Sequence, residues 1–170
     1  MGFIEAVDLA IMIGVFLLIF FVCWRKWELK RKVWGALFYG YCCVVILLTL
    51  APVAVSFLGA FQNISFSMNL VPFIDVMHER GDYIRQIILN VLLTMPLAFL
   101  LCAVLKKQRW IVPFVVFLAS VCIELLQPIL NSFRASDITD IITNTIGGIL
   151  GYLLFLVAKP LLKKWKWIDG

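Results

Sequence analysis

The chain has 170 residues, of which 64% are hydrophobic and 15% charged, and its mean hydropathy is +1.04. Soluble domains carry roughly 45–50% apolar and about 25% charged residues, so this composition excludes a soluble globular protein. Each membrane-spanning helix needs about 20 apolar residues, which leaves room for several such helices and no separate aqueous domain. No nucleic-acid-binding motif is present, so the net charge of +5 points to membrane topology and not to a nucleic-acid partner.

Five apolar stretches are long enough to cross a bilayer, and charged residues, Gly, Pro or Trp bound each of them. They lie at roughly residues 7–24, 33–58, 83–105, 110–130 and 137–158. Glu5 and Asp8 lie near the start of the chain, where a secretory signal is basic, so we expect the first stretch to remain as a membrane helix. The sequence therefore predicts one all-α integral membrane domain over residues 1–170, with five transmembrane helices, in the cell membrane.

The basic residues fall almost entirely on one side of this predicted bundle. Of the 15 basic residues, all but Arg80, Arg85 and Arg134 lie in three segments, 25–32, 106–109 and 159–170. The six tryptophans lie at the same boundary, where indole rings settle at a membrane interface. The positive-inside bias therefore predicts an N-terminus outside the cell and a C-terminus in the cytoplasm. Most acidic residues then lie on the outer side, which concentrates the polar chemistry there.

The fourth stretch carries a carboxylate inside the membrane. Glu124 lies about 9 Å below the outer end of the predicted helix, at about 1.5 Å of rise per residue. A charge at that depth is disfavoured by roughly 2.5–3.5 kcal/mol, so we expect Glu124 to be neutral, paired or facing a wet cavity. Gln127 shares its helix face. The alternative is that both side chains only hydrogen-bond neighbouring helices.

The fifth stretch has a face that is polar at its outer end and small below. Asp137, Asp140 and Asn144 follow one another at helical spacing, and glycines continue the stripe. Capping by Ser136 or Asp137 would explain the first of these positions, but it does not explain Asn144 one turn deeper. The glycines Gly147, Gly148 and Gly151 predict close helix packing, and they offer a surface through which a second copy of the chain could pair.

The third stretch begins with a plausible cap, Asp82, and carries a line of polar residues at spacings of four. The line consists of Gln86, Asn90 and Thr94, above Pro96, and it can face Glu124. Two arginines, Arg85 and Arg134, lie on the side from which other basic residues are excluded. We expect each to pair with carboxylates or with a phosphate.

Residues 59–82 are too polar for a sixth span and too apolar for a solvated loop, so we expect them to lie in the interface or to re-enter the membrane. Pro72 forces Val71 out of helical conformation.

His78, the only histidine, lies in a charged turn and is expected at the surface. No Cys or His spacing is typical of a metal site, so no metal or cofactor is predicted.

Four segments of the chain form a recognisable set: NLVPF at 69–73, NVLLTMPLAF at 90–99, ELLQ at 124–127, and R-x-x-D-x-x-D-x-x-x-N-x-x-G-x-x-x-G at 134–151. In kind and order they resemble the VanZ-like family of small membrane proteins, whose namesake accompanies low-level resistance to the glycopeptide teicoplanin. The resemblance implies a cell-envelope context. The positions that it marks are Asn69, Pro72, Asn90, Glu124, Gln127, Arg134, Asp137, Asp140, Asn144, Gly147 and Gly151.

Three functions are compatible with these patterns. The favoured one is a binding protein whose outer cavity holds an amphiphilic envelope ligand, either a lipid-linked wall precursor or a lipophilic glycopeptide. Its candidate ligand-binding residues are Glu124, Gln127, Arg134, Asp137, Asp140, Asn144, Asn90, Asn69 and Arg85. One alternative is an intramembrane enzyme that acts on a lipid-linked phosphate or glycan, in which the carboxylates hold a divalent cation and Arg134 or Arg85 binds the phosphate, although no nucleophile lies beside a base. The other is a structural scaffold for a membrane partner.

Overall fold

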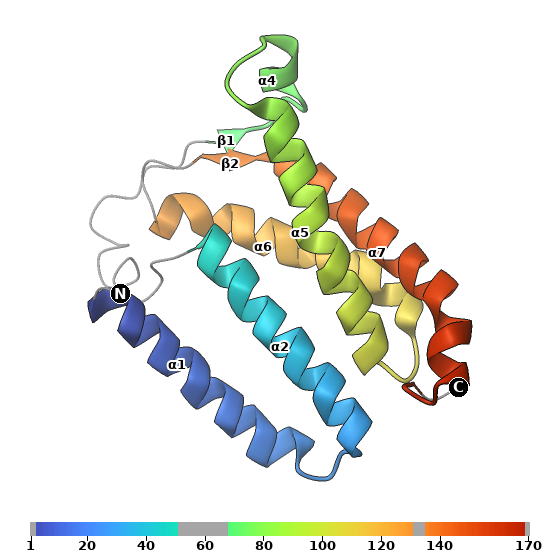
Figure 1. The fold of residues 1–170 in the computed structure, drawn as a ribbon. Coiled ribbons are helices and arrows are strands. Elements are labelled where there is room, and N and C mark those ends of the chain that lie inside the picture. The colour runs from blue at the N-terminus through green and yellow to red at the C-terminus, as the bar shows by residue number, and fades with distance from the viewer. Residues whose placement is uncertain (1–2, 51–67, 131–134, 169–170) are drawn as a thin grey trace.

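The computed structural model describes residues 3–50, 68–130 and 135–168, and helices dominate them (Figure 1). Within these described residues, five segments are long and apolar enough to cross a membrane, as predicted. The long helices are α1 (Phe3–Ile19, continued by the π-helical turn η1, Phe20–Trp24), α2 (Leu29–Thr49), α5 (Tyr83–Val104), α6 (Val112–Leu130, preceded by the 3-10 turn η2, Arg109–Ile111) and α7 (Ile138–Lys164). The chain is thus a multi-pass membrane protein.

Two helices are longer at their basic ends than the apolar stretches predict. Helix α2 begins at Leu29 instead of residue 33, and α7 continues to Lys164 instead of residue 158. Apart from Pro160, the added residues are Lys, Arg and Leu, which have high helix propensity, so the helices continue past the apolar part of the sequence. The predicted second span also included residues 51–58, which lie outside the described residues.

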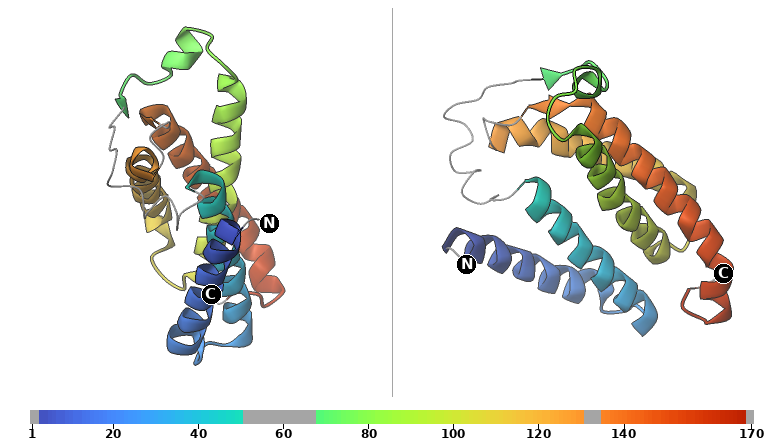
Figure 2. Two further views of the ribbon diagram at one scale, coloured as in Figure 1. Left: turned by 90° about the vertical axis from the view of Figure 1, so that its left-hand side faces the viewer. Right: turned by 45° about the horizontal axis from the view of Figure 1, so that its top comes forward.

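Helix α7 forms the centre of the bundle, packed most extensively against α5 and then against α6, while α2 packs against α5. Buried residues between α5, α6 and α7 form the apolar core: Ala98, Cys102, Ala103, Val112, Val116 and Phe155. Helix α1 lies on the outer side of α2 (Figure 2). The Tyr39 hydroxyl donates to the Met12 carbonyl over 2.7 Å, and the Phe16 and Tyr39 rings lie 5.3 Å apart, so aromatic side chains join α1 to α2.

The glycines of α7 allow its neighbours to approach closely. A Cβ atom on Gly147 would lie 2.5 Å from the Val91 carbonyl oxygen of α5, and one on Gly148 would lie 2.8 Å from the Val116 side chain of α6. A Cβ on Gly151 would overlap the Met95 carbonyl oxygen. The prediction of close packing is confirmed. Helices α5 and α6 of the same chain lie against these glycines, and the pairing of a second copy through this helix stays a prediction.

A short parallel strand pair joins two distant parts of the chain. Strand β1 (Met68–Asn69) pairs with β2 (Ser136–Asp137), which directly precedes α7. The short helix α4 (Ile74–Met77) follows β1 and leads to the start of α5. This part of the predicted interfacial segment therefore contains a strand and one helical turn, whereas residues 59–67 lie outside the described residues.

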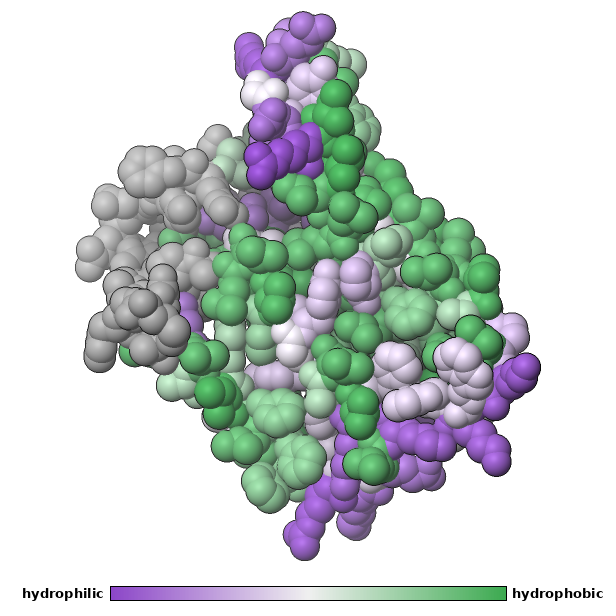
Figure 3. All heavy atoms as spheres, in the orientation of Figure 1, coloured by the Kyte–Doolittle hydropathy of each residue, from purple (hydrophilic) through white to green (hydrophobic). Residues whose placement is uncertain are grey.

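Hydrophilic side chains gather at opposite ends of the molecule, with an apolar region between them (Figure 3). We call the end with α4, β1 and β2 the acidic end. The end with the α1–α2 turn, the α5–α6 turn and the end of α7 is the basic end. The assignment of the basic end to the cytoplasm remains the prediction made from the charges.

Candidate functional site

The intramembrane carboxylate of α6 faces the protein interior near the acidic end. Glu124 is only 2% exposed, and its Oε2 accepts a hydrogen bond from the Asp137 backbone N–H over 2.9 Å. The Ser136 hydroxyl donates to the Glu124 backbone carbonyl over 2.5 Å. Both contacts connect α6 to strand β2, so the carboxylate faces protein and not lipid.

Asp137 anchors the start of α7. Its Oδ1 accepts from the Thr139 backbone N–H over 2.7 Å, which confirms the predicted N-cap. Its Oδ2 accepts from the Asn69 side-chain amide over 2.9 Å. The Thr139 hydroxyl in turn accepts from the Phe73 backbone N–H over 2.9 Å. The NLVPF segment is thus fastened to the first turn of α7 at two points.

Helices α5 and α7 are linked by polar side chains one turn deeper. The Asn90 amide donates to Asp140 Oδ1 over 2.7 Å and to the Thr143 hydroxyl over 3.3 Å. The Thr94 hydroxyl lies 2.8 Å from the Asn144 backbone carbonyl and 2.9 Å from that of Asn90. These contacts give Asn90 and Thr94 a structural role in holding α5 against α7.

Asn144 is the deepest polar residue of the α7 face, and one of its atoms has no partner. The residue is 7% exposed, and its side-chain Nδ2 donates to the Ser120 hydroxyl of α6 over 2.9 Å. Its Oδ1 is buried and accepts no hydrogen bond. An unsatisfied buried acceptor of this kind costs about 1–3 kcal/mol.

The Asn144 side chain lines a small cavity between α2, α5, α6 and α7. Its volume is about 40 Å³, which is enough for a few water molecules or one small polar group. Gln127 donates to the Thr49 backbone carbonyl over 3.3 Å and so brings α2 into the wall. The polar residues of the lining are Thr49, Asn90, Thr94, Ser120, Glu124, Gln127, Asp140 and Asn144. None of the described lining residues is basic, and the carboxyl groups of Glu124 and Asp140 and the amide of Asn144 supply hydrogen-bond acceptors to the wall.

Some predicted site residues lie elsewhere. Arg85 is exposed and lies 3.7 Å from the Asp82 carboxylate, so it does not line the cavity. Asp82 occupies the N-cap position of α5 but makes no side-chain cap hydrogen bond, contrary to the prediction. Pro72 is exposed, and His78 is exposed as expected. Arg134 lies outside the described residues.

The backbone and the side chain of Asp137 contribute to two different sites. Its backbone N–H contacts Glu124, but its side chain lines a second pocket of about 20 Å³ together with Asp75, Gln86 and Asp140. The structure therefore brings Glu124, Gln127, Asp140, Asn144 and Asn90 together on one cavity and leaves Asn69 and Asp137 beside it.

The sequence analysis named Thr94 but missed two other hydroxyl residues of the site, Ser120 and Thr49. Ser120 lies four residues before Glu124 on the same helix face, and this spacing is the signal that could have identified it. Thr49 contributes its backbone carbonyl, for which side-chain patterns give no signal.

Within residues 3–50, 68–130 and 135–168, no three His, Cys, Asp or Glu side chains gather closely enough to hold a metal ion. The alternative of a metal-dependent enzyme stays a prediction, without such a three-residue cluster among the described residues.

Comparison with known proteins identifies the family of this chain. The sequence profile of the VanZ/LLP1 family matches residues 37–159. The chain belongs to this family. It is 34% identical over 116 residues to Protein VanZ of Enterococcus faecium, a match that covers 68% of each chain. No solved structure matches.

The region shared with the VanZ/LLP1 family contains every described residue that lines the cavity. It begins within α2 and ends within α7, so α1 and the last turns of α7 lie outside it. The polar cavity thus belongs to the part of the chain that defines the family.

Proposed function

We propose that this VanZ-like protein binds an amphiphilic cell-envelope ligand at the cavity around Asn144 and Glu124. The ligand is a lipid-linked wall precursor or a lipophilic glycopeptide, and binding contributes to resistance to teicoplanin. Family membership supports the envelope context, and the predicted orientation puts the acidic end outside the cell. The polar group of the ligand would enter the cavity while its tail remains in the surrounding lipid.

The unpartnered Oδ1 of Asn144 carries this proposal. The Nδ2 of the same side chain donates to Ser120, and the neighbouring Asn90 and Thr94 also make hydrogen bonds. A ligand N–H or O–H donor would satisfy the remaining acceptor and recover the free energy lost by its burial. Wall precursors and glycopeptides are both rich in amide and hydroxyl donors. A cavity of about 40 Å³ admits one such group and leaves the rest of the head group at the acidic end.

An Asn144→Leu variant tests the proposal, because leucine is similar in size but has no acceptor. The wild type, expressed in a teicoplanin-susceptible bacterium, should raise the inhibitory concentration of teicoplanin, and Asn144→Leu should abolish that rise. Thr145→Val is the matched control: Thr145 is the next residue of α7, donates to the Ile141 carbonyl over 2.7 Å and does not line the cavity. Both variants must be present in the membrane in wild-type amounts.

A binding measurement then separates the two ligands. Purified protein in nanodiscs is titrated with fluorescent teicoplanin and, separately, with a lipid-linked wall precursor. The ligand that the protein recognises should bind the wild type and Thr145→Val alike and should bind Asn144→Leu weakly. The proposal would be contradicted if Asn144→Leu raised teicoplanin resistance as much as the wild type does, or if the wild type bound neither ligand.

A further inference from the structure

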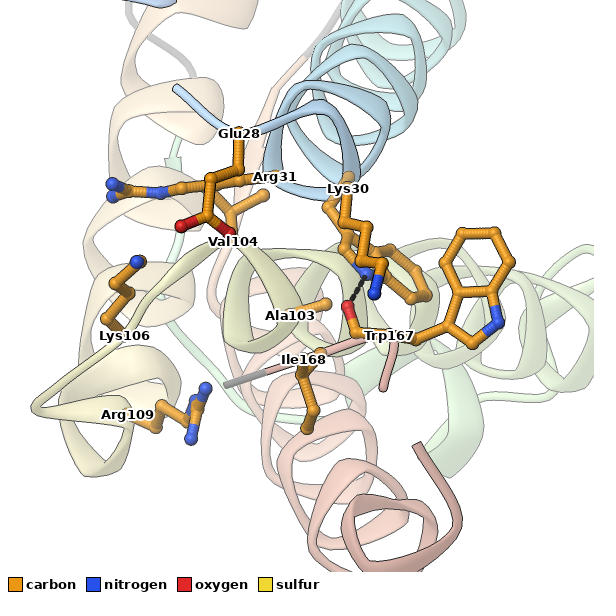
Figure 4. Close-up of a pocket in the computed structure, with 10 residues that line it drawn as sticks. Glu28, Lys30, Arg31, Ala103, Val104, Lys106, Arg109, Trp167 and Ile168 are labelled. Atoms are coloured by element: carbon orange, nitrogen blue, oxygen red, sulfur yellow. Dashed lines mark hydrogen bonds between the residues drawn. The ribbon is translucent and has the colours of Figure 1, made fainter. Parts of the chain in front are cut away.

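A second polar pocket lies at the basic end, away from the cavity around Asn144 (Figure 4). Its volume is about 30 Å³. The start of α2, the end of α5, the start of η2 and the residues after α7 form its walls. Elements far apart in the sequence therefore converge on one point of the predicted cytoplasmic surface.

The charges of this pocket are predominantly positive. Four basic residues and one carboxylate line it: Lys30, Arg31, Lys106, Arg109 and Glu28. In Figure 4, Arg31, Lys106 and Arg109 lie along one side of the pocket, and Lys30 lies near Trp167 on the other. The described lining of the pocket therefore carries more positive than negative charge.

The two arginines are held in place by contacts that leave hydrogen-bond donors for a ligand. The Arg31 guanidinium lies over the Trp27 ring, 3.9 Å from its centroid, and the Arg31 Nε is buried without a hydrogen-bond partner. The Arg109 Nε donates to the carbonyls of Cys102 and Leu105, over 3.0 and 2.8 Å. These hydrogen bonds use Nε alone, and the guanidinium rests against Phe155. An arginine fixed in this way presents its planar fork ready for an oxyanion.

Two tryptophans close the other side of the pocket. The Trp34 Nε1 donates to the Trp167 carbonyl over 3.0 Å, a bond drawn in Figure 4, and the two rings meet edge to face. This contact joins the residues after α7 to α2. Tryptophans at this level are typical of the membrane interface, so the pocket lies where lipid head groups would reach it.

We propose that the pocket binds a phosphate-bearing anion, supplied either by an anionic phospholipid head group or by a soluble phosphate. Planar guanidinium groups suit phosphate oxygens, and basic pockets between membrane helices accept anionic head groups. The pocket volume suits a single phosphate and not a whole nucleotide. This site is independent of the cavity around Asn144, because it lies at the opposite end of the bundle.

The test uses the full chain in phosphatidylcholine nanodiscs that contain increasing fractions of phosphatidylglycerol. Bound lipid is counted by native mass spectrometry, and the unfolding temperature is followed in parallel. Saturable binding with a rise in unfolding temperature is expected. The double variant Lys30→Gln/Arg31→Gln should weaken this binding about tenfold, because it removes charge-assisted hydrogen bonds. Arg31→Lys, which keeps the charge and should fold even if the double variant does not, should also weaken it.

The matched control is Lys159→Gln/Lys163→Gln, which removes the same charge from the basic end of α7 outside the pocket lining. It should bind like the wild type. A parallel titration with inorganic phosphate in pure phosphatidylcholine identifies the source of the anion: protection by phosphate and competition with phosphatidylglycerol indicate a soluble ligand, and protection by the lipid alone indicates a head group. Equal loss of binding in the pocket and control variants, or no saturable binding to either anion, would overturn the proposal.

Discussion

The Glu124 side chain stabilises the fold whether or not it also binds a ligand. Its Oε2 accepts a hydrogen bond from the Asp137 backbone N–H, and the Ser136 hydroxyl donates to the Glu124 carbonyl, so both residues of β2 are joined to α6 at Glu124. A neutral amide has an oxygen in the same position and can accept the same hydrogen bond. A Glu124→Gln variant therefore keeps the shape and the hydrogen-bond acceptor of the side chain and removes only its charge.

Glu124→Gln should accordingly fold almost as well as the wild type, whereas Glu124→Ala should lose about 1–3 kcal/mol because it leaves the Asp137 N–H unpaired. Thermal unfolding of the purified variants in detergent would measure the difference. If Glu124→Gln were as unstable as Glu124→Ala, the hydrogen bond to Asp137 would not be the main contribution of the side chain.

The two predicted helix caps offer a second comparison of single residues. Asp137→Ala should destabilise the protein by about 1 kcal/mol through the lost cap, and further through the lost contact with Asn69. Asp82→Ala should change stability little, because Asp82 makes no cap hydrogen bond and its ion pair with Arg85 is exposed. Chemical or thermal unfolding of both variants checks this order of stability. A larger loss of stability in Asp82→Ala would show that Asp82, and not Asp137, is the more important cap.

These caps also show what residue patterns can and cannot predict. Asp82 and Asp137 both precede an apolar helix and look equivalent in sequence, but only Asp137 has the extended backbone that directs its carboxylate to the first turn. The pattern of polar residues on α5, α6 and α7 predicted Asn90, Glu124 and Asn144 as neighbours. It could not predict which atom of Asn144 lacks a partner, because that depends on the position of Ser120 across the interface.

At the level of elements, the length and hydropathy of the apolar stretches were sufficient to predict the five spans but not the strand pair. Strands β1 and β2 have two residues each, too few to show any alternation. Their pairing depends instead on the docking of the Asn69 side chain on Asp137, which is a tertiary contact. The predicted bounds at the start of α2 and at the end of α7 were wrong for another reason. Polar residues with high helix propensity continue these helices beyond their apolar parts.

The packing of α5 against α7 gives a prediction at this level. Gly151→Ala should sharply reduce the folded fraction, because the added methyl group would overlap the α5 backbone. Gly40→Ala is the matched control in α2: no atom lies within 4 Å of its Cβ position, and alanine improves helix propensity there. Size-exclusion profiles and unfolding temperatures of the two variants would show the contrast. Normal folding of Gly151→Ala would mean that α5 and α7 are farther apart than described.

At the level of the whole molecule, the distribution of charge predicts the orientation in the membrane. In a cysteine-free background, Lys106→Cys should react with a membrane-impermeant thiol reagent only after permeabilisation, whereas Met77→Cys, in the exposed α4 turn, should react in intact cells. The reverse labelling pattern would exchange the two sides. It would also move the cavity around Asn144 to the cytoplasmic half of the bundle.

The long-range contacts of α7 also have a consequence for biogenesis. Asn90 of α5 and Asp140 of α7 are 50 residues apart, so the Asn90 side chain acquires this partner only when the last helix emerges from the ribosome. Until then Asn90 lacks this contact at the depth of the membrane, where polar groups strongly favour any available partner. The first four helices should therefore depend on the insertion machinery to hold them until α7 arrives. A nascent chain stopped before residue 138 should remain crosslinkable to that machinery, and release should follow the synthesis of α7.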